Sequence, residues 1–442
     1  VLNAIDLLKA LFSWEALKRT LDSGEAKIEN IGDQYRPIPA ATLQPEAIPI
    51  HTKVILIGNP FIYYLLYSYD DNFRKLFKIK ADFNWEMDRN IQNINKYAAF
   101  ISARCSRDHI LKHFNREAVA RVVEFSSRLA DNQNKLSAKF IEIDNIISEA
   151  SYWADADHSS HVSARHVQKS IDEKKFRSNL IEEKIQESIE EGTIMIEVNG
   201  RAVGRVNGLS VYDFGDYDFG KPSRITCETF VGRGGVINIE REAKLAGKIH
   251  NKGVIILSGY LGGKYGIDKL MAMSATVGFA QSYEEIEGDS ASSAELYAII
   301  SSLADIPLKQ CIAVTGSVNQ KGEIQPIGGV NQKIEGFFDI CVLKGLNGDQ
   351  GVIIPRQNRR NLMLKNQVIK AVADGMFHIW PINNIDEGIE ILTGRSSGVK
   401  KVDGSYPKDS VHWLVNERLE EFGRKFKESS GTLEPQKNKE AA

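Results

Sequence analysis

The sequence predicts an α/β protein in which two mixed strand-and-helix parts flank an all-helical part. Three patterns in its 442 residues point to this organisation. A short apolar run at 54–57 is stopped by Gly58-Asn59-Pro60, which is typical of a buried strand followed by a turn. Apolar residues recur at helical spacing through most of 86–172, and strand patterns alternate with helical patterns from 193 to 395. A chain of this length can hold two or three domains, each with its own core.

The first two parts of the chain differ in their predicted elements. Residues 1–85 alternate apolar strands with helices, and the aromatic-rich segment 61–67 packs after the strand at 54–57. Residues 86–172 are expected to form a helical subdomain whose last helix is capped by Ser163. Residues 173–192, rich in Glu, Lys and Arg, predict a solvated or interdomain connector helix. The helices expected in the subdomain are 86–106, 116–130, 138–154 and 164–173.

The longest predicted domain covers 193–395 and combines a mixed sheet with helices. A loop is expected at 212–220, where two Asp-Phe-Gly triplets favour turns. Residues 396–442 are expected to contribute a helix at 411–426 and a polar, disordered tail. The strands expected in the domain are 193–198, 202–206, 224–230, 236–240, 253–257, 312–314 and 352–354, and its helices are 266–276, one after Ser290, and 330–342.

The composition argues against several classes of partner. A formal net charge of −2 and a pI near 6.6 give no electrostatic case for nucleic acid or an anionic membrane. The four cysteines lack a Cys-x-x-Cys pair, as expected of reduced thiols in a cytoplasmic protein. The sequence has no run of about 18 apolar residues and no signal-peptide pattern. It begins with Val1 in place of Met, which is expected of a truncated or trimmed chain.

Two residues in the segment 287–333 point to nucleophilic chemistry. Ser290 follows a Gly-Asp turn and precedes a helical pattern, so its hydroxyl is expected at a helix N-terminus, where free N–H groups stabilise an oxyanion. Lys333 is expected in the first turn of the helix 330–342, where the helix dipole and apolar burial lower the pKa of an ammonium. The neutral amine is the general base that a serine nucleophile needs. The plainer alternatives are a helix N-cap for the serine and a solvated helix residue for the lysine.

Three strings around these residues carry a family resemblance. Glu-Gly-Asp-Ser-Ala-Ser at 287–292, Thr-Gly-Ser-Val at 315–318 and Pro-Ile-Gly-Gly-Val-Asn-Gln-Lys at 326–333 resemble the proteolytic domain of Lon proteases. The similarity covers most of 195–395, and the separation of the serine from the lysine matches that family's Ser/Lys dyad. The resemblance implies a Lon-type serine endopeptidase that degrades unfolded polypeptides. It also implies a homo-oligomer, a hexameric ring that encloses the active sites in a chamber.

The same resemblance suggests supporting residues around the dyad. Thr315 resembles the threonine that hydrogen-bonds the catalytic lysine, with an ordinary turn hydroxyl as the alternative. Glu287 is a candidate for orienting the dyad, with a solvated loop acid as the alternative. Asp289 can form an ion pair with Lys333 in a resting state, which would raise the pKa of the lysine and hold it charged.

The first 172 residues resemble, more loosely, the second half of a Lon-type AAA+ module. Asn59 takes the sensor-1 position in this resemblance, and Arg74 is a candidate arginine finger. Asn3 and Ala4 stand where a Walker B strand would end in Asp-Glu, so Mg²⁺ loses a ligand and the attacking water loses its base. No Gly-x-x-x-x-Gly-Lys-Ser/Thr motif occurs in the sequence. We therefore expect a partial or degenerate module that serves assembly more than hydrolysis. No cofactor is expected in this chain, and ATP and Mg²⁺ are implied only if an upstream half supplies that motif.

A group of acidic and histidine residues near the end of the helical part raises a metal hypothesis. It lies in a loop before a capped helix and lacks a His-Glu-x-x-His motif or cysteine support, so we expect no metal site. The group consists of Asp155, Asp157, His158, His161 and His166.

Three functional hypotheses follow from the sequence. The first is the Lon-like endopeptidase with Ser290 and Lys333 as its dyad. The second is a catalytically silent assembly or substrate-binding module in which Asp289 permanently neutralises Lys333. The third is an ATP-dependent Lon protease truncated before its Walker A half.

Overall fold

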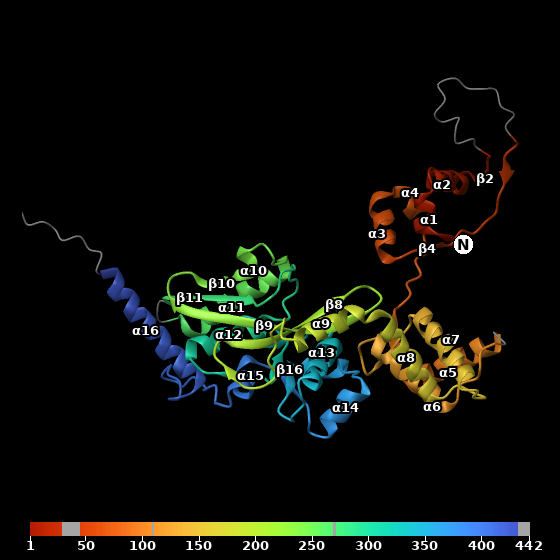
Figure 1. Cartoon of the computed structure of the whole chain (residues 1–442). Coiled ribbons are helices and arrows are strands. Elements are labelled where there is room, and N and C mark those ends of the chain that lie inside the picture. The colour runs from red at the N-terminus through yellow and green to blue at the C-terminus, as the bar shows by residue number, and fades with distance from the viewer. Residues whose placement is uncertain (29–44, 108–109, 268–270, 432–442) are drawn as a thin grey trace, which may run out of the picture. The chain divides into compact units, whose positions relative to one another are not determined.

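A computed structural model describes residues 1–28, 45–107, 110–267 and 271–431 (Figure 1). The contacts within the chain divide it into two compact units, residues 1–84 and 85–442. The last eleven residues of the polar tail predicted as disordered lie outside the described residues. Among the described residues, no helix is both long enough and apolar enough to cross a membrane.

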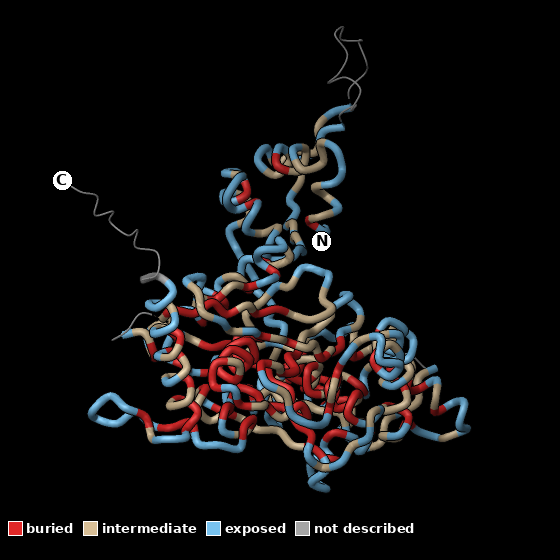
Figure 2. Tube along the Cα trace, turned by 60° about the vertical axis from the view of Figure 1, so that its left-hand side comes forward, coloured by how far each residue is buried: buried red, intermediate tan, exposed pale blue. Residues whose placement is uncertain are grey.

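The first unit combines short helices with strands of two residues each. β1 pairs with β4 in parallel, and β2 pairs with β3 antiparallel. Asp70 links two of the helices, because its carboxylate accepts hydrogen bonds from Trp14 Nε1 at 2.7 Å and Lys18 Nζ at 2.8 Å. Most residues of this unit are exposed or partly exposed (Figure 2). Its elements are β1 (Leu2–Asn3), α1 (Ala4–Lys9), α2 (Ser13–Ser23), β2 (Glu25–Ala26), β3 (Ile48–Pro49), β4 (Leu56–Ile57), α3 (Pro60–Tyr69) and α4 (Asp71–Leu76).

A helical bundle opens the second unit and has its own core. The apolar residues of α5 recur every fourth position at Tyr97, Ile101 and Cys105, and all three are buried against α6 and α7. The helix predicted from residue 86 starts later, because Glu86–Asp88 pairs as a strand with Lys135–Ser137. The elements are β5 (Glu86–Asp88), α5 (Ile91–Arg107), α6 (Arg116–Leu129), β6 (Lys135–Ser137), α7 (Phe140–Ala156) and α8 (Ala164–Ser178).

The predicted connector at 173–192 is divided between two helices. Its first residues extend α8, and the remainder forms α9 (Leu180–Glu190). This helix is not solvated all round, since Glu182 and Ile189 are buried. Ile185 and Ile189 belong to the apolar core beneath the following sheet, so α9 is an integral part of that domain.

A seven-stranded mixed sheet forms the centre of the remaining chain, with strand order β10-β11-β9-β8-β13-β16-β17. The β8–β9 and β9–β11 pairs are antiparallel, whereas β8–β13, β13–β16 and β16–β17 are parallel. The strands of the sheet are β8 (Arg205–Asp213), β9 (Asp218–Val231), β10 (Gly235–Asn238), β11 (Met273–Phe279), β13 (Ile312–Val314), β16 (Gly351–Pro355) and β17 (His378–Ile382). Smaller strands are β7 (Arg201–Ala202), β12 (Leu308–Lys309), β14 (Ser317–Val318) and β15 (Ile324–Gln325).

Helices cover both faces of this sheet and create two apolar cores. One core contains buried residues of α11, α12, α15 and α16, and the other contains buried residues of α9, α13 and α14. Buried residues concentrate in the sheet and these helices (Figure 2). The helical elements are α10 (Ile239–Glu242), α11 (Lys248–Tyr265), α12 (Ser292–Ala304), α13 (Val330–Leu343), the 3₁₀ helix η2 (Arg356–Asn361), α14 (Asn366–Ala373), α15 (Ile385–Thr393) and α16 (Val411–Gly431).

Four element predictions in this domain are wrong. The strand expected at 253–257 is part of α11, because a short apolar run has the same pattern in a buried helix as in a buried strand. The helix expected at 266–276 lies partly outside the described residues, at 268–270, and its last residues belong to β11, whose side chains alternate across the sheet. Residues 193–198 are irregular, and the expected loop at 212–220 narrows to a tight turn between β8 and β9.

Candidate active site

Ser290 lies in a turn directly before α12. Gly288 opens this turn with φ +94°, a conformation that favours glycine. The Ser290 carbonyl accepts hydrogen bonds from the Gly316 N–H at 2.8 Å and the Thr315 hydroxyl at 3.3 Å. Among the described residues, the N–H groups of Ser290 and Ala291 donate to no acceptor. The Ser290 hydroxyl therefore lies beside two backbone N–H groups without an acceptor. The backbone of the turn is held by its hydrogen bonds to Thr315 and Gly316, which directly follow β13.

Lys333 reaches the same place from the other side of the sheet. α13 begins after Gly329, which adopts φ +65°, and the Lys333 N–H donates to the Gly329 carbonyl at 3.0 Å in the first turn. The Lys333 side chain is only 3% exposed. Its Nζ donates to Ser290 Oγ at 2.7 Å and to Thr315 Oγ1 at 3.2 Å. The structure thus brings together the three residues that the sequence singled out.

The burial of Lys333 changes its proton affinity. Burial disfavours the ammonium form and lowers the pKa of Lys333 to about 8, while the negative charge of Asp289 acts in the opposite direction. Roughly a tenth of such lysines are neutral at pH 7, compared with about one in several thousand for a solvated lysine. The Lys333 amine is consequently available as a base near neutral pH.

Asp289 does not pair with the lysine in this structure. Its carboxylate accepts a hydrogen bond from Ser317 Oγ at 2.8 Å. Among the ion pairs of the described residues, none joins Asp289 to Lys333. The ion pair considered from the sequence is therefore not formed, although the two charges are close enough to influence one another.

Glu287 contacts a helix instead of the dyad. Its carboxylate accepts a hydrogen bond from the Ile249 N–H at 3.2 Å, in the first turn of α11. A carboxylate at this end of a helix complements both the free N–H groups and the helix dipole. A Cβ at Gly247 would collide with the same carboxylate, so a larger residue there would displace the Glu287 side chain from the helix end. The hypothesis that Glu287 orients the dyad directly has no contact to support it.

Two features near the dyad escaped the sequence interpretation. Ser317 belongs to the Thr-Gly-Ser-Val string, but nothing in the string shows that its hydroxyl faces Asp289. Glu295 in the first turn of α12 is 1% exposed, and its burial raises its pKa to about 8. Asn238 Nδ2 lies 3.3 Å from Glu295 Oε1 and 3.3 Å from His250 Nε2, so these three side chains form a buried polar cluster. Sequence periodicity predicts only that these positions are internal.

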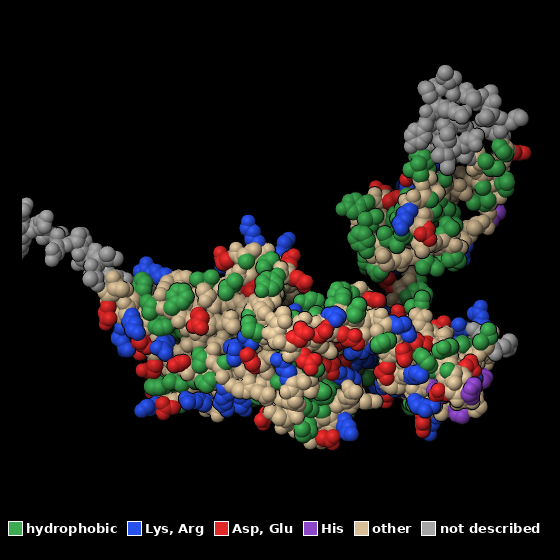
Figure 3. Space-filling model, in the orientation of Figure 1, with side chains coloured by type: hydrophobic (Ala, Val, Ile, Leu, Met, Phe, Trp, Pro, Cys, Tyr) green, Lys and Arg blue, Asp and Glu red, His purple; other side chains and the backbone are tan. Residues whose placement is uncertain are grey.

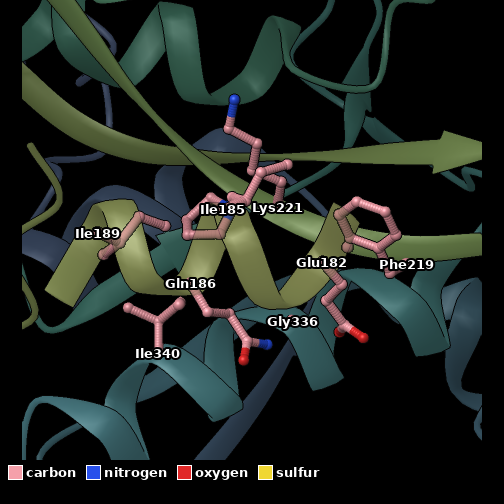
Figure 4. Close-up of a pocket in the computed structure, with 10 residues that line it drawn as sticks. Glu182, Ile185, Gln186, Ile189, Phe219, Lys221, Gly336 and Ile340 are labelled. Atoms are coloured by element: carbon pink, nitrogen blue, oxygen red, sulfur yellow. The ribbon is translucent and has the colours of Figure 1, made fainter. Parts of the chain in front are cut away.

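Two glycines bring α13 unusually close to β9. A Cβ on Gly336 would overlap the backbone of Gly220, and a Cβ on Gly220 would overlap the backbone of Gln332 and Lys333. A small cavity of about 10 Å³ lies beside this contact, between α9, β9 and α13 (Figure 4). It holds no more than about one water molecule, and the Lys221 amine points away from it (Figure 4). The cavity is a packing feature and the glycine contact fixes the position of the lysine helix.

The residues assigned to a nucleotide site have other partners in the first unit. Asn3 Oδ1 accepts from the Ile5 N–H at 2.9 Å and caps α1. Asn59 Oδ1 accepts from the Ile62 N–H at 2.9 Å and caps α3. Arg74 pairs with Asp71 at 2.7 Å within α4. Asn3 and Asn59 thus act as helix N-caps in this structure, and Arg74 acts in an ion pair within one helix.

The acidic and histidine group has structural roles. His166 Nδ1 accepts from the Ser163 N–H at 3.0 Å at the start of α8, and Asp157 pairs with Arg165 at 2.7 Å. His158 and His161 are exposed. Within the described part of the chain, no group of three or more His, Cys, Asp or Glu side chains is arranged to hold a metal ion.

Three family models match successive parts of the chain. Residues 1–84 match a LonB-like AAA domain, residues 113–177 match the LID domain of an archaeal LonB AAA+ ATPase, and residues 277–394 match the C-terminal proteolytic domain of Lon protease (S16). The last match includes the serine turn, Thr315 and the lysine helix.

Several curated proteins are similar over most of the chain. A protein of Escherichia coli K12 named "Putative Lon protease homolog" is 34% identical over 365 residues, covering 81% of this chain and 61% of that protein. A protein of Haemophilus influenzae with the same name is 32% identical over 425 residues, covering 95% of this chain and 69% of that protein. The archaeal Lon protease of Pyrococcus abyssi is 27% identical over 354 residues, covering 76% of this chain and 33% of that protein. The alignments thus span between 61% and 69% of the length of the two bacterial relatives.

Proposed function

Because this chain belongs to the Lon protease family, we propose that it is a serine endopeptidase in which Ser290 is the nucleophile and Lys333 the general base. The observation that carries the proposal is the contact of 2.7 Å between Lys333 Nζ and Ser290 Oγ. The lysine is buried and has a pKa of about 8, so its amine loses its proton readily near neutral pH.

The proposed reaction proceeds through an ester on Ser290. The neutral amine of Lys333 takes the proton from Ser290 Oγ as this oxygen attacks the carbonyl carbon of the scissile peptide bond. The tetrahedral intermediate then collapses, the C–N bond breaks, and the lysine returns the proton to the leaving amine. A water molecule, deprotonated by the same lysine, hydrolyses the ester and regenerates the serine hydroxyl. Thr315 keeps the lysine in position throughout, because Lys333 Nζ also donates to Thr315 Oγ1.

The backbone before α12 is the proposed oxyanion site. The N–H groups of Ser290 and Ala291 have no acceptor among the described residues, and they precede the N-terminus of a helix. Free donors of this kind, fixed before the reaction begins, stabilise a developing negative charge without reorganisation. The anchored Ser290 carbonyl supports this role, because it holds the turn to Gly316.

The substrate and the assembly are also proposals. Unfolded polypeptides are the proposed substrates, and a ring of identical chains, a hexamer, is the proposed active form. We propose no cofactor for the chemistry of this chain. The ATP-dependent alternative would require phosphate-binding and metal-binding residues from outside this sequence. The alternative of a catalytically silent module is less well supported. It requires an ion pair between Asp289 and Lys333, whereas the Asp289 carboxylate accepts a hydrogen bond from Ser317 Oγ.

Hydrolysis of fluorescein-labelled casein tests the assignment. Ser290→Ala and Lys333→Ala should each reduce the rate to background, because one removes the nucleophile and the other its base. A fluorophosphonate probe should label the wild-type chain and leave Ser290→Ala unlabelled. Full casein activity in either variant, or labelling that persists in Ser290→Ala, would reject the corresponding role.

A further inference from the structure

Ser317 holds the carboxylate that neighbours the proposed nucleophile. It lies in β14, is 4% exposed, and donates from Oγ to Asp289 Oδ2 at 2.8 Å. Gln325 Oε1 is a second acceptor at the longer distance of 3.4 Å, so the hydroxyl proton favours the aspartate. A hydrogen bond to a charged acceptor at a mostly buried position is among the stronger ones in proteins. Asp289 is thereby fixed in one orientation.

This orientation matters because Asp289 has a competing partner. Asp289 directly precedes Ser290, whose Oγ accepts a hydrogen bond from Lys333 Nζ at 2.7 Å, so the carboxylate belongs to the turn that the amine contacts. Its negative charge acts against the lowering of the Lys333 pKa by burial. The lysine amine nevertheless contacts Ser290 Oγ and Thr315 Oγ1. A carboxylate that turned towards the amine would gain a strong opposite charge and would keep the amine protonated.

The other charged groups along the first turns of α13 are occupied. Asp218 at the start of β9 accepts from Gln332 Nε2 at 2.8 Å. Glu335 is paired with Arg128 of α6 at 2.6 Å. Asp289 on the Ser290 turn is the charged group whose field acts on Lys333.

We propose that Ser317 is a positioning residue whose hydroxyl holds the Asp289 carboxylate away from Lys333, so that the amine stays bonded to Ser290. The inference rests on the proposed function, since it concerns the reactivity of that serine and that lysine. It assigns to β14 a task in the catalytic cycle: to keep the base free of its nearest carboxylate.

The inference predicts a specific change in pH dependence. Removing the Ser317 hydroxyl frees Asp289 to pair with Lys333, and a new ion pair raises the pKa of a lysine by about 1–3 units. The neutral fraction of Lys333 at pH 7, and with it kcat/KM, should fall at least about tenfold. The deficit should shrink as the pH approaches the raised pKa, because the amine is then neutral in both proteins.

Hydrolysis of labelled casein by the full chain, measured from about pH 6 to 10, tests this. The wild type should show a rise in kcat/KM with its midpoint near pH 8, and Ser317→Ala should move that midpoint upwards by at least about one unit. Asp289→Asn in the Ser317→Ala background should remove the shift, because an amide cannot neutralise the lysine. Ser292→Ala is the matched control, since it breaks a neighbouring hydrogen bond between α12 and β14, from the Val318 N–H at 3.1 Å, without touching Asp289. Its midpoint should equal that of the wild type.

A second measurement separates this inference from the proposed function. The side-chain NMR signal of Lys333, identified by its loss in Lys333→Met, reports the lysine pKa without any need for activity. A wild-type chain without Ser290-dependent hydrolysis would reject the proposed function, while the NMR titration would still decide the role of Ser317. Equal lysine pKa values in the wild type and Ser317→Ala, or a shift that survives Asp289→Asn, would overturn the positioning role.

Discussion

A single buried lysine dominates the chemistry of the site at the residue scale. Lys333 is 3% exposed and lies against two hydroxyls without an ion-pair partner among the described residues. Burying an ammonium in this way costs folding free energy, and the lowered pKa expresses that cost. If Lys333 is the base of the proposed reaction, the requirement of that reaction opposes stability at this position.

The cost of this lysine predicts how stability depends on pH. Between about pH 8 and 10.5, the amine is neutral in the folded chain and charged in the unfolded chain, so the unfolded state binds more protons and stability rises with pH. Below about pH 8, Lys333 is protonated in both the folded and the unfolded chain, so its contribution to stability no longer changes with pH. The free energy of unfolding of the wild type minus that of Lys333→Met should therefore increase by on the order of 3 kcal/mol over this window.

Urea unfolding of the wild type and Lys333→Met at several pH values measures this difference. Lys184→Met is the control, because Lys184 is 68% exposed and its hydrogen bond to Glu187 raises its pKa, in the direction opposite to that of Lys333. The corresponding difference for Lys184→Met should therefore not increase with pH. A flat difference for Lys333→Met would show that the lysine is not desolvated in the folded chain.

At the scale of secondary-structure elements, the position of α13 decides where Lys333 lies. α13 carries Lys333 and is pressed against β9 through Gly220 and Gly336. Any side chain at these two positions would push the helix away from the sheet. The serine side of the site is held by different contacts, from the Ser290 carbonyl to Gly316. The distance between the serine and the lysine thus depends on the seating of one helix.

Gly336→Ala tests the seating of α13. The added Cβ would overlap the Gly220 carbonyl, so we expect a loss of about 1–3 kcal/mol of stability and a fall in kcat of at least about tenfold. Gly262→Ala in α11 is the matched control, because nothing lies within 4 Å of its added Cβ. The control should be neutral or stabilising by up to about 1 kcal/mol. Wild-type activity in Gly336→Ala would show that the helix adapts.

The helical bundle contacts the same helix from another side. Arg128 at the end of α6 makes a bidentate ion pair with Glu335, from Nη1 to Oε1 at 2.6 Å and from Nη2 to Oε2 at 2.7 Å. Its Nη1 also donates to the Met363 carbonyl at 2.8 Å. Asn331 Nδ2 donates to Asp131 Oδ1 at 3.1 Å. These bonds flank the position of Lys333 in the sequence, so the bundle contributes to holding α13.

Arg128→Ala should weaken this attachment. Glu335 is only 13% exposed in its side chain and would lose its cation, which we expect to cost about 1–3 kcal/mol in thermal or urea unfolding. Lys184→Ala is the control, because both partners of the Lys184–Glu187 pair are more than half exposed, and ion pairs in solvent contribute little to stability. If Arg128→Ala lost no more stability than Lys184→Ala, the contact between the helical bundle and α13 would not stabilise the chain.

The first unit bears on assembly at the scale of the whole molecule. Large apolar side chains are exposed over α3, among them Phe61 at 69% and Tyr69 at 88% (Figure 3). Exposed apolar surface of this extent is typical of a surface that contacts another protein. It supports the proposal that the chain works as an oligomer.

Native mass spectrometry tests the assembly directly. The chain has a mass of 49.4 kDa, and the proposed hexamer would have six times that mass. Ser290→Ala serves as the control. This variant should lose activity, but its particle should have the same mass as that of the wild type, because Ser290 has no proposed role in assembly. A monomer at micromolar concentration would contradict a closed ring.

The sequence by itself determined the family, the α/β class with its helical part, and the three residues that meet in the site. It did so because the linked strings around Ser290, Thr315 and Lys333 carry local turn and helix signals at fixed separations. The strand at 312–314 and the helix beginning at residue 330 are confirmed for the same reason. Local patterns failed for α11 and β11, where an apolar run satisfies either a strand or a helix and only packing against the sheet decides.

Only the tertiary structure decided which charges meet. Asp289 and Ser317 lie far apart in sequence, and their hydrogen bond exists because β14 folds back beside the Ser290 turn. The same folding directs Glu287 to the start of α11 and buries Glu295 in the first turn of α12. Side-chain orientation across segments is set by the packing of the whole domain, and no periodicity along the chain records it.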